Sequence, residues 1–427
     1  MSPPPSSDAA APRSPSAAQQ HDLIVIGAGP AGLCFSRALA GSGLSIALVD
    51  VQDAQALSAP AFDGREIALT RHSIALLRQL GLWERIPAEE RHTLRAARVL
   101  NGAQARAMEV EPAGPCGETL GALVPNHAIR RAAWESIQDQ AGLQLHLGAR
   151  PIAVETNAER AEVQLSTGAL LRARLLVAAD SRFSETRRAL GVAADMEDFG
   201  KTMLVCRMRI EGDHADTAWE WFGHGQTLAL LPLGPGQASA VITLPHAGIQ
   251  ALLRMDDARF GEELTRRFEG RLGAMQALGS RHAYPLVGVY PRQFVGDRFA
   301  LVGDAAVGMH PVTAHGFNFG LLGQDLLAQR LRTAHAQGRD IANPRDLQGY
   351  ARELRRATRP LYLATRAIAR LYTSESAPAR LLRRAGIEFR ARVLPFRRAL
   401  AGALASSGDS RAQTRPLSQG LRALLRG

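Results

Sequence analysis

The sequence is poor in cysteine, lysine and aromatic residues, and it has no long hydrophobic run. Its three cysteines, Cys34, Cys116 and Cys206, are far apart, and no pair has the spacing of a zinc site or a redox motif. This excludes a disulfide framework and favours a reducing compartment. No stretch approaches the ~18 uninterrupted apolar residues that span a bilayer. We therefore expect a cytoplasmic protein whose membrane contact is at most peripheral.

Basic residues are present but unevenly distributed. From residue 352 to the end, 17 arginines stand against four acidic residues, whereas the rest of the chain carries 34 basic and 36 acidic residues. The basic segment interleaves leucine and isoleucine with arginine, which suits either an anionic membrane surface or a partner, or an ordinary helix with a solvated face. Nucleic-acid binding is a poor fit, because the segment lacks interleaved base-stacking aromatics.

A glycine-rich turn follows the first predicted strand, residues 22–27, and precedes a predicted helix that reaches Ala40. Its glycines would allow a tight turn, close approach of a pyrophosphate and close helix–strand packing, and an acid after the second strand could accept a ribose hydroxyl. These residues are Gly27, Gly29, Gly32 and Asp50. The strand, the helix and the acid predict a dinucleotide site, which could take FAD or NAD.

A second signal lies near residue 300, where an apolar strand ends in a Gly-Asp pair. Asp304 would lie at the carboxyl edge of a sheet, where ligands bind in such folds. His-Pro and His-Gly-Phe-Asn follow, with Pro311, His315, Gly316 and Asn318. Gly316 opens a long predicted helix whose amino end could stabilise negative charge on a reduced flavin ring.

Together these motifs resemble the class A FAD-dependent aromatic hydroxylases, and within them the ubiquinone-biosynthesis hydroxylases (UbiH, UbiF, UbiI and UbiM). The stretch 311–318 is most similar to the UbiM branch. The resemblance implies that Asp304 holds the ribityl chain of FAD, and that Pro311, Gly316 and Asn318 lie beside the isoalloxazine ring.

Two further segments resemble this family. Residues 63–69 resemble a D-x-R segment whose arginine lies over FAD, which implies that Arg65 is a cofactor contact. Residues 120–134, with Asn126 and Arg130, resemble the helix that closes the adenine side.

The chain departs from the family pattern at two positions. The family's central Ala-Asp-Gly is Ala-Asp-Ser here, so Asp180 keeps the carboxylate while Ser181 gives up the freedom of glycine at positive φ. Because that motif is thought to serve FAD and nicotinamide, the reductant site comes into question. Many relatives carry Gln where this chain has His315. We hypothesise that His315 assists proton transfer, although a purely structural role fits it equally.

The resemblance implies an α/β fold, with a Rossmann-like FAD-binding domain of the glutathione-reductase type, like p-hydroxybenzoate hydroxylase, an inserted β-sheet substrate domain and C-terminal helices. The expected segments are a disordered leader (1–20), the first part of the FAD-binding domain with some substrate-domain strands (21–199), the substrate-domain sheet (200–290), the second part of the FAD-binding domain (291–345), C-terminal helices (346–405) and a flexible basic tail (406–427).

The activity implied is hydroxylation of a polyprenylated phenol in ubiquinone biosynthesis. NADH or NADPH would reduce FAD, dioxygen would add at the flavin C4a carbon, and the hydroperoxide would oxygenate the ring. The basic C-terminal segment would contact the inner face of the membrane or a ubiquinone-biosynthesis complex. No metal is expected.

Four alternatives to this activity can be considered, and the sequence argues against two of them. A disulfide reductase would need a Cys-x4-Cys pair, but only Cys34 is present. A halogenase is disfavoured because Gly223-His224 replaces the Ile-Pro that should follow Trp219-Glu220-Trp221. A nicotinamide or other flavin oxidoreductase without hydroxylation, and a non-enzymatic flavin-bound scaffold, remain open.

Overall fold

The computed structural model describes residues 18–101, 108–112, 119–223, 225–310 and 315–373. One of its three sheets is built around parallel strands in the order β17-β18-β11-β1-β2-β8. These are β17 (Val295–Gly296), β18 (Phe299–Leu301), β11 (Leu170–Ala178), β1 (Gln19–Ile26), β2 (Ile46–Val49) and β8 (Leu143–His146), with β9 (Pro151–Thr156) and β10 (Ala161–Leu165) attached beside β11. Residues 23–26 of β1, 46–49 of β2 and 175–178 of β11 are apolar and buried, because both faces of a parallel sheet are covered there.

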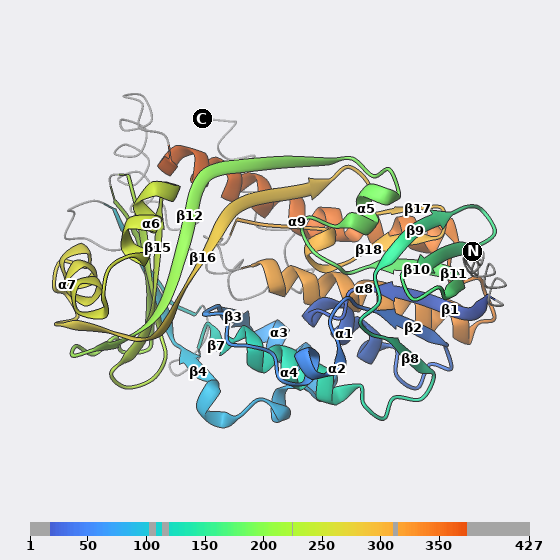
Figure 1. Ribbon diagram of the computed structural model, residues 1–427, viewed down its shortest axis with the longest axis horizontal. Coiled ribbons are helices and arrows are strands. Elements are labelled where there is room, and N and C mark those ends of the chain that lie inside the picture. The colour runs from blue at the N-terminus through green and yellow to red at the C-terminus, as the bar shows by residue number, and fades with distance from the viewer. Residues whose placement is uncertain (1–17, 102–107, 113–118, 224, 311–314, 374–427) are drawn as a thin grey trace, which may run out of the picture.

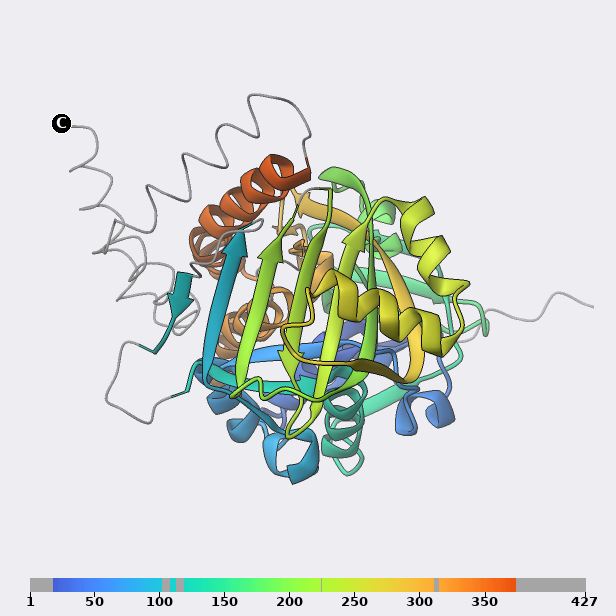
Figure 2. The ribbon, with the colours of Figure 1, turned by 90° about the vertical axis from the view of Figure 1, so that its left-hand side faces the viewer.

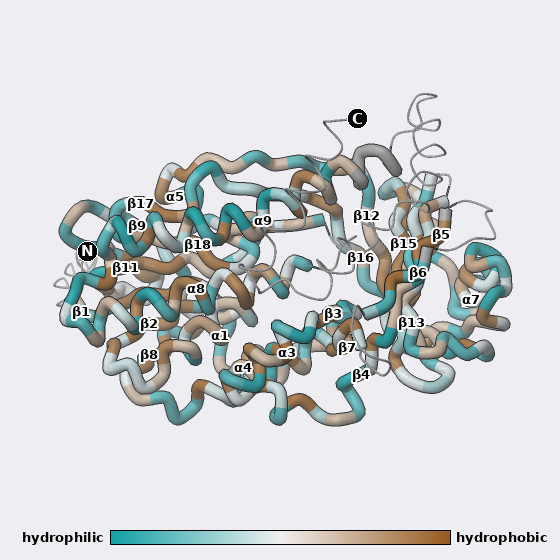
Figure 3. Tube along the Cα trace, turned by 180° about the vertical axis from the view of Figure 1, so that it is seen from behind, coloured by the Kyte–Doolittle hydropathy of each residue, from teal (hydrophilic) through white to brown (hydrophobic). Residues whose placement is uncertain are grey.

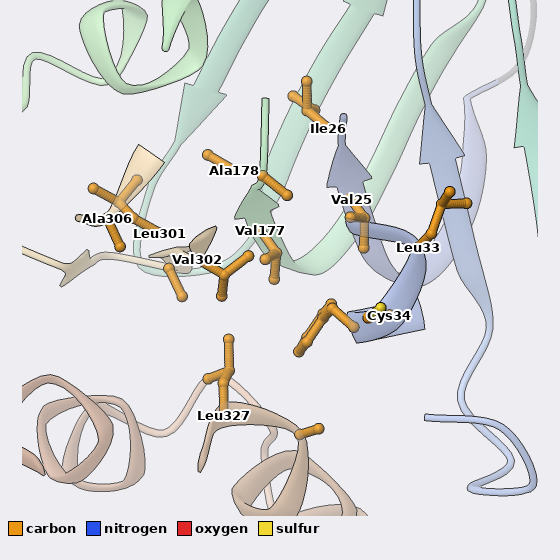
Figure 4. Close-up of a cluster of buried hydrophobic side chains, with 14 of the residues drawn as sticks. Val25, Ile26, Leu33, Cys34, Val177, Ala178, Leu301, Val302, Ala306 and Leu327 are labelled. Carbon is orange, nitrogen blue, oxygen red and sulfur yellow. The ribbon is translucent and has the colours of Figure 1, made fainter. Parts of the chain in front are cut away.

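Helices α1 (Pro30–Ala38) and α8 (Gly316–Ala336) pack side by side against this sheet. Figure 4 shows the resulting core, in which Val25, Val177 and Val302 of neighbouring strands lie near Cys34 of α1 and Leu327 of α8. Burial of these side chains contributes the main stabilising free energy of this half. Cys34 is buried in this core as a small apolar residue.

The second sheet has the order β16-β12-β15-β14-β13-β5-β6. Its strands are β5 (Ala96–Asn101), β6 (Met108–Val110), β12 (Ala194–Ile210), β13 (Thr217–Phe222), β14 (Thr227–Pro232), β15 (Gln237–Leu244) and β16 (Met275–Pro291). The long strands β12 and β16 run from this sheet to the first one (Figure 1). Helices α6 (His246–Leu253) and α7 (Asp257–Arg267) cover its outer face, which is turned toward the viewer in Figure 2.

A third, small sheet lies below the gap between the other two, with the order β3-β7-β4 (Figure 1). It consists of β3 (Glu66–Thr70), β7 (Gly121–Pro125) and β4 (His92–Leu94), flanked by α3 (Arg71–Gln79) and α4 (Asn126–Ser136). The remaining elements are α2 (Ala54–Ser58), α5 (Glu185–Ala189), α9 (Pro344–Thr373) and the 3-10 turns η1 (Trp83–Arg85), η2 (Ala88–Glu90) and η3 (Gly303–Ala305). Hydrophobic segments concentrate in the strands of both large sheets (Figure 3).

The predicted α/β architecture with an inserted sheet is confirmed, with shifts at element ends. Strand β12 begins in a polar stretch and becomes buried only in its second half. Helix α7 begins at Asp257, where the Asp256 carboxylate caps it, and ends at Arg267. Within the C-terminal helices expected over 346–405, the described residues form one helix, α9, as far as residue 373, and the rest of that range lies outside the described residues.

Candidate active site

The glycine-rich turn leads from β1 into α1. Gly27 has a φ of 108°, and a Cβ there would lie 2.6 Å from the Ala179 carbonyl oxygen. A Cβ on Gly32 would lie 1.8 Å from the Gly27 carbonyl oxygen, so both positions require glycine. At Gly29, the residue before α1, a Cβ would meet nothing within 4 Å. The amino end of α1 therefore faces open space in front of a positive helix dipole, as a diphosphate site requires.

Asp50 lies directly after β2 and is 8% exposed. Its Oδ2 accepts a 2.5 Å hydrogen bond from the Ala28 backbone N–H, and its Oδ1 accepts one of 2.7 Å from the Gln52 backbone N–H. The Arg130 guanidinium, on α4, donates to the Gln52 side-chain oxygen over 2.9 Å. The structure thus brings Asp50 and Arg130 together at one end of the glycine turn, linked through Gln52.

Asp304 lies in η3, after β18, and a Cβ on the preceding Gly303 would lie 2.5 Å from the Ala31 side chain. The Gly-Asp turn therefore packs against α1. The Asp304 carboxylate accepts a 3.1 Å ion-paired hydrogen bond from Arg182, which also donates to the Val287 carbonyl oxygen over 3.1 Å. Arg182 is a cation at the predicted cofactor edge that the sequence reading did not single out.

Asp180 binds the amino end of the short helix α5, whose N-cap residue is Ser184. The Asp180 carboxylate accepts a 2.6 Å hydrogen bond from the Ser184 hydroxyl and a 3.2 Å hydrogen bond from the Thr186 backbone N–H. Among the described non-glycine residues, a positive φ occurs only at Ala215, Asp216, Glu269 and Arg298. The backbone at Ser181 therefore has no need of glycine. The loss of glycine's freedom that the sequence suggested places no strain on this turn.

The loop before β3 carries Arg65. Its guanidinium forms a 2.6 Å ion pair with Asp63 and lies over the Tyr284 ring, 5.5 Å from the ring centroid. The Asp63 carboxylate also accepts a 2.7 Å hydrogen bond from the Asn126 side-chain amide, and the Asp63 carbonyl oxygen accepts one of 2.6 Å from the Tyr284 hydroxyl. Burial opposes ionisation, but Arg65 and Asn126 hold the pKa of the Asp63 carboxyl below its usual range. The loop is thus fixed to α4 and to β16.

The first turn of α8 is fastened to β3 by Asn318, which is 2% exposed. Its side-chain oxygen accepts a 3.0 Å hydrogen bond from the Thr70 backbone N–H, and its side-chain nitrogen donates one of 2.8 Å to the Ala68 carbonyl oxygen. Because both ends of the amide bind β3, Asn318 completes the hydrogen bonding of that strand's edge. The position of Gly316 is different, since a Cβ there would meet nothing within 4 Å. Within the part of the chain that the structure describes, nothing covers the amino end of α8 at Gly316, as at the amino end of α1.

Two histidines lie near this helix end. His315 is 2% exposed and lies with its ring centroid 5.7 Å from that of Phe319. Burial, and to a lesser extent Arg182, lowers the pKa of His310 to about 4, so its imidazole is neutral at pH 7. The His310 ring lies 4.8 Å from the Phe199 ring. Pro311 lies outside the described residues.

The residues present fit FAD. Two helix amino ends open onto space that a Cβ would not fill, one carboxylate stands at the end of β2, and a second stands at η3. Among the described residues, no group of three or more His, Cys, Asp or Glu side chains could hold a metal ion. None of the described helices combines the length and apolar character that crossing a membrane requires.

Comparisons with known proteins agree with this geometry. A family model described as FAD binding domain matches residues 20–360. The ubiquinone hydroxylase UbiM of Neisseria meningitidis is 43% identical over 376 residues, which cover 86% of this chain and 82% of that protein. The ubiquinone hydroxylase UbiL of Rhodospirillum rubrum is 34% identical, with 91% and 90% covered.

Solved structures support the fold. The crystal structure of PqsL, a probable FAD-dependent monooxygenase from Pseudomonas aeruginosa, superposes with a TM-score of 0.71 at 19% identity and covers 87% of this chain and 100% of its own. The p-nitrophenol 4-monooxygenase PnpA from Pseudomonas putida gives a TM-score of 0.73 at 16% identity, with 92% and 100% covered. At these identities the likeness concerns the fold alone.

Proposed function

Because the chain belongs to the ubiquinone hydroxylase family of FAD-dependent monooxygenases, we propose that it hydroxylates the aromatic ring of a polyprenylated phenol, with NADH or NADPH as reductant and dioxygen as oxidant. The observation that carries the proposal is the pair of open helix amino ends, at Gly29 and Gly316, with Asp50 and Asp304 beside them. When bound, FAD would accept electrons from the nicotinamide and activate dioxygen.

Each site residue has a role in this proposal. The turn of Gly27, Gly29 and Gly32 would receive the diphosphate of FAD, and Asp50 would accept a ribose hydroxyl. Arg130 would approach the adenosine end through Gln52. These residues bind and orient the cofactor and take no part in bond breaking.

The flavin end would be held by a second group. Asp304 would accept a hydrogen bond from a hydroxyl of the ribityl chain, either after its ion pair with Arg182 breaks or while one carboxylate oxygen still binds Arg182. Arg65 would approach the ring from the loop, and Gly316 would approach it at the amino end of α8. Asp180 would hold the amino end of α5 in place, and Asn318 would hold the start of α8 in place.

The test is the visible spectrum of the purified protein, followed by oxidation of NADH or NADPH with and without a prenylated phenol. The expected result is a flavin spectrum, faster oxidation with the phenol, and a product that carries one atom of ¹⁸O from labelled dioxygen. Phenol-stimulated oxidation that yields only hydrogen peroxide would identify a flavin oxidoreductase without hydroxylation. A colourless protein that FAD does not reconstitute would refute the proposal.

We also propose that α9 contacts an anionic membrane surface. Arg352, Arg356, Arg359 and Leu363 are exposed and share one face of the helix, with Leu363 48% exposed. Arg355 on the inner side lies over the Phe294 ring at 4.9 Å and so serves packing. Sedimentation with vesicles of anionic lipid should retain the protein at low salt and release it at high salt. Equal binding to neutral vesicles would contradict an electrostatic contact.

A further inference from the structure

Strand β13 carries a glutamate between two tryptophans. Trp219 and Trp221 are buried in the cluster that includes Phe260 and Leu264 of α7, on the outer face of the seven-stranded sheet. Because successive side chains of a strand point to opposite faces, Ala218, Glu220 and Phe222 lie on the inner face. Ala218 indeed packs with the cluster of Leu94, Leu120 and Leu123, which belongs to the small-sheet side. Glu220 therefore faces the FAD-binding half of the molecule.

Strand register places Glu220 in one row across the inner face. Its members are Val99, Glu220, Ala229, Val241, Val205 and His282. The far end of the row touches the loop of Arg65, because a Cβ on Gly64 would lie 2.8 Å from both Val205 and His282. With strands spaced roughly 4.8 Å apart, Glu220 lies about 15 Å along the sheet from that contact.

The other members of this row are apolar except for His282, and two of the nearest neighbours of Glu220 are small. Ala218 precedes it on the same face, and Ala229 lies directly opposite on β14, whereas Val99 and Phe222 on its other sides are larger. The methyl groups of the two alanines are too small to cover the carboxyl group, and part of Glu220 stays accessible.

Among the residues that the structure describes, none forms a hydrogen bond or an ion pair with the Glu220 carboxyl. Part of the side chain is still accessible, yet burial raises the pKa of this carboxyl to about 8. A group that is both accessible and desolvated lines an internal space and not the outer surface. Placing an unpaired carboxyl there costs stability, which points to a ligand as its partner.

We propose that Glu220 is the polar anchor of the substrate site, where its carboxyl group hydrogen-bonds a ring oxygen of the phenol while the apolar inner face receives the prenyl chain. This inference rests on the proposed function. A protonated carboxyl can both donate to and accept from a phenol hydroxyl, so it suits an uncharged ring. Glu220 is thereby a specificity-determining residue that fixes which ring position faces the flavin.

The test measures the affinity of the FAD-bound protein for two probes by the change in flavin absorbance. One probe is a phenol with a two-isoprene side chain, and the other is the same compound without the ring hydroxyl. Wild-type protein should prefer the phenol by roughly 10-fold or more, as expected for a buried hydrogen bond whose loss leaves a polar group unpaired. Glu220→Leu should abolish the preference, whereas Glu220→Gln should retain most of it.

The matched control is Glu155→Leu, the same change at an exposed position of β9, which should leave the preference intact. Glu220→Leu should also unfold at a temperature no lower than wild type, because the change removes an unpaired buried carboxyl. An intact preference in Glu220→Leu, or equal affinity of wild type for both probes, would overturn this inference. Failure of wild type to oxidise nicotinamide faster with the phenol would instead overturn the proposed function.

Discussion

The ion pair between Glu66 and Arg207 joins the small sheet to the seven-stranded sheet, and its removal should lower the free energy of unfolding of the protein. Glu66 is on β3 with a side chain 0% exposed, and Arg207 is on β12. The Arg207 Nε and Nη2 atoms each lie 2.9 Å from the same oxygen of Glu66, while the second oxygen has no hydrogen-bond partner among the described residues. The guanidinium also lies over the Phe62 ring, 4.8 Å from its centroid.

Arg207→Met keeps much of the side-chain volume and removes the cation. Breaking a buried pair on one side costs roughly 3–5 kcal/mol, because an unpaired charge stays buried. Burial already raises the pKa of Glu66 despite Arg207, so in the variant this carboxyl would bind a proton more readily still. Its folded pKa would then lie further above the unfolded one. The destabilisation should therefore grow as the pH rises above the usual range of a glutamate.

The assay is a double-mutant cycle on thermal unfolding at fixed FAD concentration, at pH 6 and pH 8. Arg207→Met should lower the midpoint more at pH 8 than at pH 6, and Glu66→Leu combined with Arg207→Met should return to within about 1 kcal/mol of wild type. Exposed Arg209→Met, two residues along β12, is the matched control. Additive losses in the double variant, or a loss independent of pH, would refute the reasoning.

Four further outcomes are expected. Gly32→Ala should abolish FAD retention, read from the absorbance of the purified protein, because its Cβ would lie 1.8 Å from the Gly27 carbonyl oxygen. Asp50→Ala should weaken FAD binding roughly 10- to 100-fold in a reconstitution titration, because a charged acceptor is lost. His315→Ala should lower kcat near neutral pH and alter its pH profile, and an unchanged rate and profile would count against proton transfer. Glu220→Gln should gain stability relative to wild type as the pH rises from 5 to 8. In wild type the carboxyl ionises in the unfolded state while its raised pKa keeps it protonated in the folded state, which lowers the stability of wild type alone; a constant difference in the unfolding midpoints would contradict this.

The cofactor-binding half could be predicted from the sequence because its determinants are local. The strand, the glycine turn and the helix lie within residues 19–38, and Gly27 and Gly32 are required by backbone geometry that short-range spacing reveals. Asp50 is some twenty residues on and reaches the turn because β2 pairs in parallel with β1. The family resemblance rests on this turn together with Asp304 and the stretch 311–318, and it is confirmed by the relatives found.

The long-range contacts could not be predicted. Asn318 binds the backbone of β3 across about 250 positions of sequence, and nothing in the local pattern indicates that pairing. Glu220 is adjacent to two tryptophans in sequence, yet it lies on the opposite face of the sheet from them. Which face is turned toward the FAD-binding half depends on the elements that pack on each face, and these come from distant parts of the sequence. A charged residue within an alternating buried strand was the one signal available.

The walls on both sides of the proposed substrate space are held together by polar side chains that bind backbone or charge across sheets. Tyr284 of β16 donates to the Asp63 carbonyl oxygen, and Asn318 of α8 binds both backbone groups of β3 that it faces. Arg207 then ties β12 to the same strand β3. Because the loop of Arg65 is continuous with β3, any movement of the seven-stranded sheet must carry that loop and the start of α8 with it. A flavin held by this loop and a ring held by the sheet would thus keep a fixed relative position, which selective oxygenation of one ring carbon requires.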